Sequence, residues 1–69
     1  MKLDIIKTLR DTNRLGMVSK ATNGNVIIHE LISMWTNAER WEQVNVIATV
    51  VRPTDPEYSE TVEYLGLGN

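Results

Sequence analysis

Apolar residues recur every three or four positions along much of this chain, which is the spacing of one face of an α-helix. The first such segment covers residues 2–13. Its apolar side carries Leu3, Ile6 and Leu9. Gly16 follows at a position suited to the end of a helix, where a glycine readily adopts the left-handed conformation. The pattern therefore predicts an N-terminal helix over 2–13.

A second apolar stripe runs through residues 26–51 with the same alternation of steps. One long helix fits this stripe. Two helices fit it equally well, because "TNAE" has the form of a capping box, with Thr36 as the cap and Glu39 at the third helical position. The sequence leaves both versions open. The members of the stripe are Ile27, Leu31, Met34, Ala38, Trp41, Val44 or Asn45, Ala48 and Val51.

Part of the same region also suits a β-strand. In "VNVIATVV", residues 44–51, six of the eight residues are β-branched, which favours a sheet. Asn23-Gly24 is a strong hairpin-turn signal, but the segments on either side of it do not alternate as strands do. We therefore interpret Asn23 or Asn25 as a helix cap and keep a strand at 44–52 as the alternative.

The C-terminal region predicts another helix. Pro53 ends the preceding element, and "TDPE" then forms a second capping box with Thr54 as the cap. Gly66 supplies the stop. The apolar residues of this helix are Tyr58, Val62 and Leu65. Together the segments predict one small domain over 1–69 with an all-α fold, a bundle of three to four helices. The alternative is an α+β fold with a strand at 44–52.

Composition limits how such a chain is stabilised. A chain of 69 residues buries only about 60% of its unfolded surface, so its core is small. Cysteine is absent and only one histidine is present, which leaves no disulfide and no structural zinc site. Oligomerisation is the remaining common source of stability. The first residues do not resemble a signal peptide, and the longest apolar run is far shorter than the roughly 20 residues of a membrane span, so we expect a cytoplasmic protein.

Charge is divided unevenly along the chain. Residues 1–24 hold five basic and two acidic side chains, a net +3, whereas residues 25–69 hold two basic and seven acidic, a net −5. This asymmetry fits either mutual attraction of the two halves, which we favour, or a face for an anionic partner. Nucleic acid is the alternative partner, although the sequence pI near 5.2 argues against it. The residues of the anionic-partner face are Lys2, Lys7, Arg10, Arg14 and Lys20.

The segment "HELIS" raises the question of a catalytic or metal site. A zinc-protease motif needs a second histidine four residues after His29, and Ser33 stands there instead. His29 and Ser33 could form a nucleophile–base pair one helical turn apart, but a regular helix supplies no oxyanion hole. We interpret the segment as the polar edge of an amphipathic helix and expect no catalytic residue, metal or cofactor.

Two tryptophans remain to be explained. Trp35 and Trp41 lie six positions apart, so on one continuous helix they cannot both face a narrow core, and tryptophan is enriched at interfaces. We expect a non-enzymatic protein-interaction module, acting as a homo-oligomer or as a small acidic adaptor or inhibitor of another protein. Trp41→Ala is then expected to shift the oligomer equilibrium or to abolish partner binding. The expected interface residues are Ile27, Leu31, Met34, Trp35 and Trp41.

Overall fold

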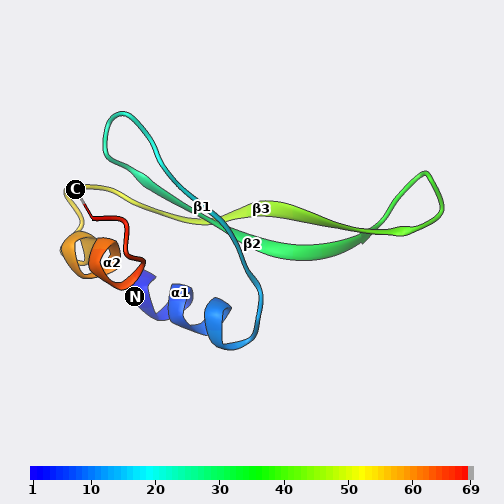
Figure 1. The fold of residues 1–69 in the computed structure, drawn as a ribbon, viewed down its shortest axis with the longest axis horizontal. Coiled ribbons are helices and arrows are strands. Elements are labelled where there is room, and N and C mark those ends of the chain that lie inside the picture. Colours follow the sequence, from blue (N-terminus) through cyan, green and yellow to red (C-terminus); the bar gives the residue numbers. More distant parts are fainter. Residues whose placement is uncertain (69) are drawn as a thin grey trace.

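The computed structural model describes residues 1–68, which form a three-stranded antiparallel sheet with two helices on one of its faces (Figure 1). The strand order is β1-β2-β3. The expected all-α bundle is therefore wrong, as is the description of the chain as helical. The alternative α+β class is the correct one. The elements are α1 (Lys2–Asp11), β1 (Leu15–Lys20), β2 (Val26–Trp35), β3 (Trp41–Val51) and α2 (Tyr58–Tyr64).

The predicted central helix is a long β-hairpin. β2 and β3 pair without interruption from Val26 opposite Val51 to Trp35 opposite Trp41, apart from one β-bulge. Steps of four keep residues on one face of a strand, but steps of three do not, so the strand places Leu31 and Met34 of the predicted stripe on opposite faces. The β-branched residues of 44–51 decide in favour of the strand because β2 is available as a partner.

Both hairpin turns have the same construction, a three-residue loop whose last residue is left-handed. In the first turn the Ala21 N–H donates to the carbonyl of Asn25 at 2.8 Å, and Gly24 has φ of +92°. In the second, which covers residues 36–40, the corresponding bond from Thr36 to Arg40 is 3.0 Å long. Asn23-Gly24 is thus a hairpin turn and not a helix cap, and "TNAE" is a turn and not a capping box.

A polar bridge fixes the middle of the sheet. The side-chain oxygen of Asn45 in β3 accepts a hydrogen bond from the Met17 N–H in β1 at 2.8 Å, reaching across β2. A Cβ on residue 16 would collide with this oxygen, so Gly16 leaves room for the bridge. The predicted helix stop at Gly16 is therefore wrong. β1 has a bulge at this point, between Leu15 and Val18.

The helix ends follow the two-bond pattern of a Schellman motif. After the end of α1, Asn13 has φ of +60°, and the Arg14 N–H donates to the Leu9 carbonyl at 2.7 Å. After the end of α2, Gly66 has φ of +67°, and the Leu67 N–H donates to the Val62 carbonyl at 3.0 Å. The predicted stop at Gly66 is confirmed.

The acidic residues of "TDPE" bind the first turn of α1. α2 begins at Tyr58 without a side-chain cap, so the second predicted capping box is wrong. The Glu57 carboxylate instead accepts a hydrogen bond from the Leu3 N–H at 2.7 Å, capping the start of α1. Asp55 accepts from the Lys2 ammonium at 2.9 Å and from the Arg52 N–H at 2.7 Å. The loop before α2 is thereby fastened to the first turn of α1.

The core lies between the helices and one half of the sheet. Leu3, Ile6 and Leu9 are buried on α1, which confirms the predicted apolar side of that helix. The apolar side of α2 packs against the same cluster through Tyr58, Val62 and Leu65, also as predicted. The strands contribute Val26, Ile28 and Val51, all close to the first turn or to the end of β3. The other half of the β2–β3 hairpin has no helix beneath it.

Candidate interaction surface

The β2–β3 hairpin extends well beyond the two helices as an arm, which we define as residues 31–47 (Figure 1). The molecule is 42 Å long but only 26 and 18 Å across, and the arm accounts for the long dimension. A two-stranded hairpin by itself is at best marginally stable in water. The arm therefore lacks the cover that the rest of the sheet receives.

One face of the sheet carries no helix along its whole length, and we call it the open face. Val26 and Ile28 point to the helices, so the odd-numbered residues of β2 point to the opposite side. Their cross-strand partners in β3 share that side. None of these residues is charged. The open face includes Ser19 from β1, Ile27, His29, Leu31, Ser33 and Trp35 from β2, and Trp41, Gln43, Asn45, Ile47 and Val50 from β3.

Several large apolar side chains of the open face are in contact with solvent. Trp41 is 68% exposed, Ile47 64% and Trp35 58%. Single exposed apolar residues are common on proteins, whereas contiguous exposed apolar patches are typical of binding surfaces. Trp35 and Trp41 lie together at the tip, and Ile47 lies on the same face about 20 Å along the strand from Trp41. Ile47 was not among the predicted interface residues, because a helical pattern gives no reason to separate it from its neighbours. The period of two of a strand would have placed it on the same face as Trp41.

The expected interface residues are divided between the two faces of the sheet. Ile27, Leu31, Trp35 and Trp41 all lie on the open face. Met34 lies on the opposite face of the arm, where it is 48% exposed. The other residues of that face of the arm are Ile32, Glu42, Val44 and Val46. The structure thus brings four of the five predicted residues together, on a strand pair and not on a helix.

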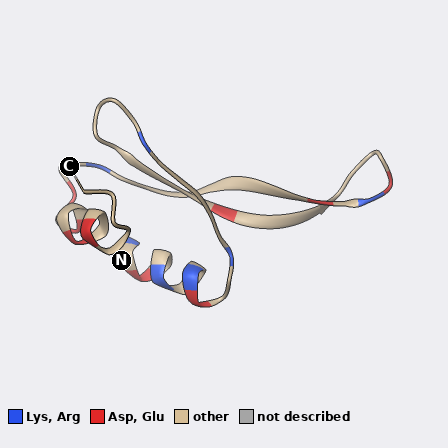
Figure 2. Ribbon diagram, viewed as in Figure 1, with Lys and Arg blue, Asp and Glu red and all other residues tan. Residues whose placement is uncertain are grey.

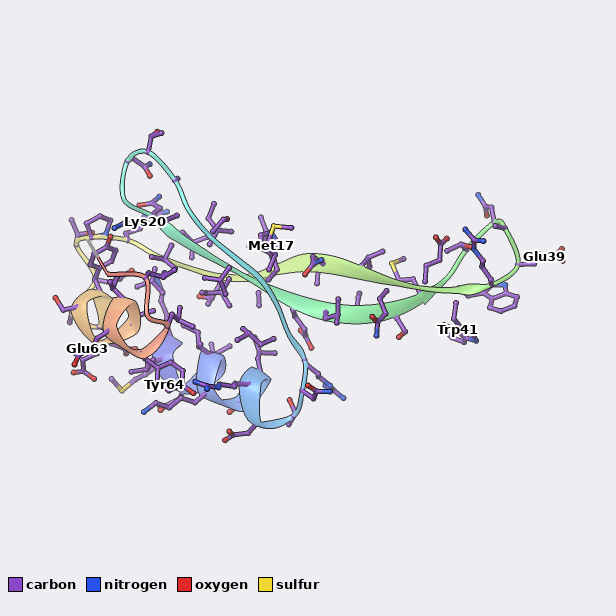
Figure 3. The ribbon with its side chains drawn as sticks, viewed as in Figure 1. Met17, Lys20, Glu39, Trp41, Glu63 and Tyr64 are labelled. Carbon is purple, nitrogen blue, oxygen red and sulfur yellow. The ribbon has the colours of Figure 1, made fainter. Side chains whose placement is uncertain are left out.

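The two tryptophans lie at the tip of the arm, next to the 36–40 turn, where Figure 3 labels Trp41. They stand directly opposite each other, with ring centroids 5.6 Å apart and an angle of 69° between the ring planes. Such an edge-to-face pair contributes about 0.5–1.5 kcal/mol beyond burial. Arg40 and Glu42 form an ion pair of 3.5 Å beside them. The tryptophans therefore stabilise the tip while a large part of each ring stays exposed.

Both edges of the arm leave backbone groups unpaired. Leu31 donates to the Arg14 carbonyl at 2.8 Å, so the N–H groups of odd-numbered β2 residues point away from β3. Thr36 donates to Arg40 across the hairpin, so the even-numbered pairs of the arm are the hydrogen-bonded ones. In β3 the N–H and C=O groups that point outward consequently belong to Trp41, Gln43, Asn45 and Ile47.

"HELIS" lies in a strand, so the predicted amphipathic helix at this position is wrong. The His29 Nδ1 lies 2.9 Å from the Met17 carbonyl oxygen, and Glu30 points to the other face of the sheet, 3.9 Å from Arg14. Four residues along a strand separate His29 from Ser33 by about 13 Å, too far for a nucleophile–base pair. Within residues 1–68, no group of three or more potential metal ligands comes together.

The five basic residues of the proposed anionic-partner face do not form one surface. Lys2 pairs with Asp55, and Arg14 lies beside Glu30. Lys7 and Arg10 lie 5.5 and 5.3 Å from the centre of the Tyr64 ring, at the end of α2. Lys20 lies near the first turn, far from the others (Figures 2 and 3). A nucleic-acid partner remains a prediction without geometric support.

No helix in residues 1–68 is long and apolar enough to cross a membrane. Comparison of the chain with protein-family models, with curated proteins and with solved structures finds no match.

Proposed function

We propose that the protein is a non-enzymatic protein-interaction module that binds another protein chain through its arm, as a homo-oligomer or as an adaptor or inhibitor of a different protein. One observation carries this proposal: the arm exposes large apolar side chains and unpaired strand edges where no helix covers it. Burying these groups against a second chain removes apolar surface from water and satisfies backbone hydrogen bonds.

The chemistry of the open face supports binding over catalysis. Its side chains are aliphatic, aromatic, amide or hydroxyl groups, and the one titratable group, His29, is in contact with a backbone carbonyl. An uncharged surface loses little solvation free energy when it is covered, whereas burying a charge is costly. The cost of covering this surface with another protein is therefore low.

Ile47→Ser tests the proposal more cleanly than Trp41→Ala, because Trp41 also stabilises the tip through Trp35. Ile47 is 64% exposed, so its replacement leaves the core intact. We expect Ile47→Ser to weaken self-association or partner binding at least tenfold. Ile5→Ser is the matched control, since Ile5 is an exposed isoleucine on α1. Light scattering over a tenfold concentration range measures the mass, and affinity capture with each variant measures partner binding.

The two tryptophans are the only ones in the chain and both lie at the tip, so their fluorescence reports on the arm alone. Covering the arm should shift their emission to shorter wavelength in the wild type and in Ile5→Ser. Two results together would contradict the proposal. The first is a wild type that stays monomeric. The second is a capture experiment in which every protein retained by the wild type and by Ile5→Ser is also retained by Ile47→Ser.

A further inference from the structure

The free edge of β3 has two definite ends. It begins at Trp41, directly after the 36–40 turn. It ends after Ile47, where the β-bulge changes the direction in which successive backbone groups point. Beyond the bulge, the Lys2 ammonium donates to the Val50 carbonyl at 2.7 Å and occupies the edge there. Residues 41–47 are therefore the stretch of β3 that another strand can reach.

The free edge of β2 is less suitable for pairing. It begins only after Leu31, because the Leu31 N–H is taken by the Arg14 carbonyl of the chain entering β1. Outward-pointing backbone groups on the remaining part belong to Ser33 and Trp35. A strand added there would meet the α1–β1 connection after a few residues, so β3 offers the longer and less obstructed edge.

We propose that residues 41–47 of β3 pair antiparallel with the same residues of a second copy, about a two-fold axis at Val44, joining two three-stranded sheets into one. This rests on the proposed function and specifies its partner as a second copy of this chain. Pairing of this kind uses main-chain hydrogen bonds for affinity and side-chain pairs for register.

The register about Val44 satisfies every outward backbone group of the free edge. It places Trp41 opposite Ile47 of the second copy, and Gln43 opposite Asn45 of the second copy, in both directions. All four residues present outward N–H and C=O groups, so both pairs are hydrogen-bonded ones. Moving the axis to residue 43 leaves Ile47 without a strand partner, and moving it to residue 45 brings Trp41 against the bulge. Only the axis at Val44 uses the whole edge.

The side chains match in the same register. Trp41 and Ile47 are the most exposed large apolar residues of the strands, and the two-fold axis brings them together on the open face. Glu42, the one charged residue of the segment, faces Val46 of the second copy, so no like charges meet. A strand from a different protein would match this edge only if it also carried apolar residues six positions apart, opposite Trp41 and Ile47. The symmetry of the edge about its own midpoint therefore favours a second copy.

Single-cysteine variants test the register directly, because the chain has no cysteine of its own. In the proposed pairing Val44 faces itself as a non-hydrogen-bonded pair, with Cα atoms about 4.5 Å apart, a separation that a disulfide can span. Val46→Cys is the matched control on the same face of the arm. Its two copies would be about 13 Å apart, four residues along the strand, and cannot be bridged. We expect mild oxidation to convert most of Val44→Cys, but little of Val46→Cys, to a covalent dimer.

Gln43→Pro provides a second test that does not depend on cross-linking. Gln43 points its N–H outward, so proline removes a donor of the dimer without breaking the β2–β3 ladder. We expect the mass of Gln43→Pro by light scattering to stay at 7.8 kDa. At the same concentration Gln43→Thr, which keeps the N–H, should reach twice that value. Circular dichroism of both variants checks that the monomer is folded.

Each result decides between the two proposals. A wild-type dimer with no preferential cross-link at Val44→Cys, or with Gln43→Pro still dimeric, overturns the β3–β3 pairing and leaves the interaction module standing. A wild type that is monomeric across the whole range also overturns the pairing, and the interaction module then depends on the capture experiment with Ile47→Ser.

Discussion

Glu39 occupies in the second hairpin turn the position that Gly24 occupies in the first. Both are left-handed, with φ of +57° and +92°. This conformation costs a residue with a Cβ about 1–2 kcal/mol. Glycine avoids that cost, but it also loses more conformational entropy on folding, which offsets part of the stabilisation. We expect Glu39→Gly to stabilise the arm by about 0.5–1 kcal/mol. Urea unfolding followed by tryptophan fluorescence measures the change at the tip.

Ala38→Gly is the control for this prediction. Ala38 is the neighbouring turn residue and does not have a positive φ, so glycine there should give no gain and a small loss of stability. Equal effects of the two substitutions would show that the conformation of Glu39 is not strained in solution.

Thr61 is the one fully buried polar side chain of the core, and its hydroxyl has no hydrogen-bond partner within residues 1–68. An unsatisfied buried hydroxyl costs about 1–3 kcal/mol, and valine has nearly the same shape without it. We expect Thr61→Val to raise the free energy of unfolding by about 1 kcal/mol in urea denaturation. Thr8→Val on the exposed side of α1 should stay within about 0.5 kcal/mol of the wild type. A loss of stability in Thr61→Val would indicate a water or protein partner for the hydroxyl in solution.

At the scale of elements, the first turn of α1 and the loop before α2 act as one unit through Asp55. The hydrogen bond from the Arg52 backbone, followed by that from Lys2, lowers the pKa of the Asp55 carboxyl below its usual value. Because the folded-state pKa is the lower one, the contribution of Asp55 to stability is present above its unfolded-state pKa. It is lost as the pH falls through the folded-state pKa.

This contribution predicts how the effect of Asp55→Asn depends on pH. We expect the variant to be less stable than the wild type at about pH 7, and the difference to shrink towards about pH 2, as the wild-type carboxyl becomes protonated. Asp4→Asn is the matched control, since the Asp4 carboxylate makes no side-chain hydrogen bond or ion pair within residues 1–68. Unfolding midpoints in urea across the pH series measure both. A difference that is the same at every pH would rule out the charge of Asp55 as its cause.

The helices and the strands differed in how well their sequences predicted them. α1 and α2 were predicted because each has a one-sided apolar pattern, and α2 also has a glycine at its end. The hairpin was missed because the steps of four and three through Ile27, Leu31 and Met34 match one face of a helix, whereas in the strand Met34 lies on the other face. Glu39 added to the error, since a glutamate at the left-handed turn position makes "TNAE" resemble the start of a helix.

At the scale of the whole molecule, the elongated shape arises because the core packs against only half of the sheet. Two short helices can cover the strands near Val26 and Val51, and the hairpin continues beyond their reach. The uncovered arm brings together, on one face and one edge, the residues on which both proposals depend. The charges lie mostly on the helices and at the hairpin ends, so they leave the open face uncharged (Figure 2).

The sequence by itself determined the two helices and the apolar residues that they bury. Those features depend on local spacing and on single residues such as Gly66, which act within one or two turns of chain. The tertiary structure alone decided that residues 26–51 form a hairpin, because a strand requires a partner that local spacing does not reveal. It also decided which face stays open and where the β3 edge ends, since the helices, the bulge and Lys2 come from distant parts of the chain.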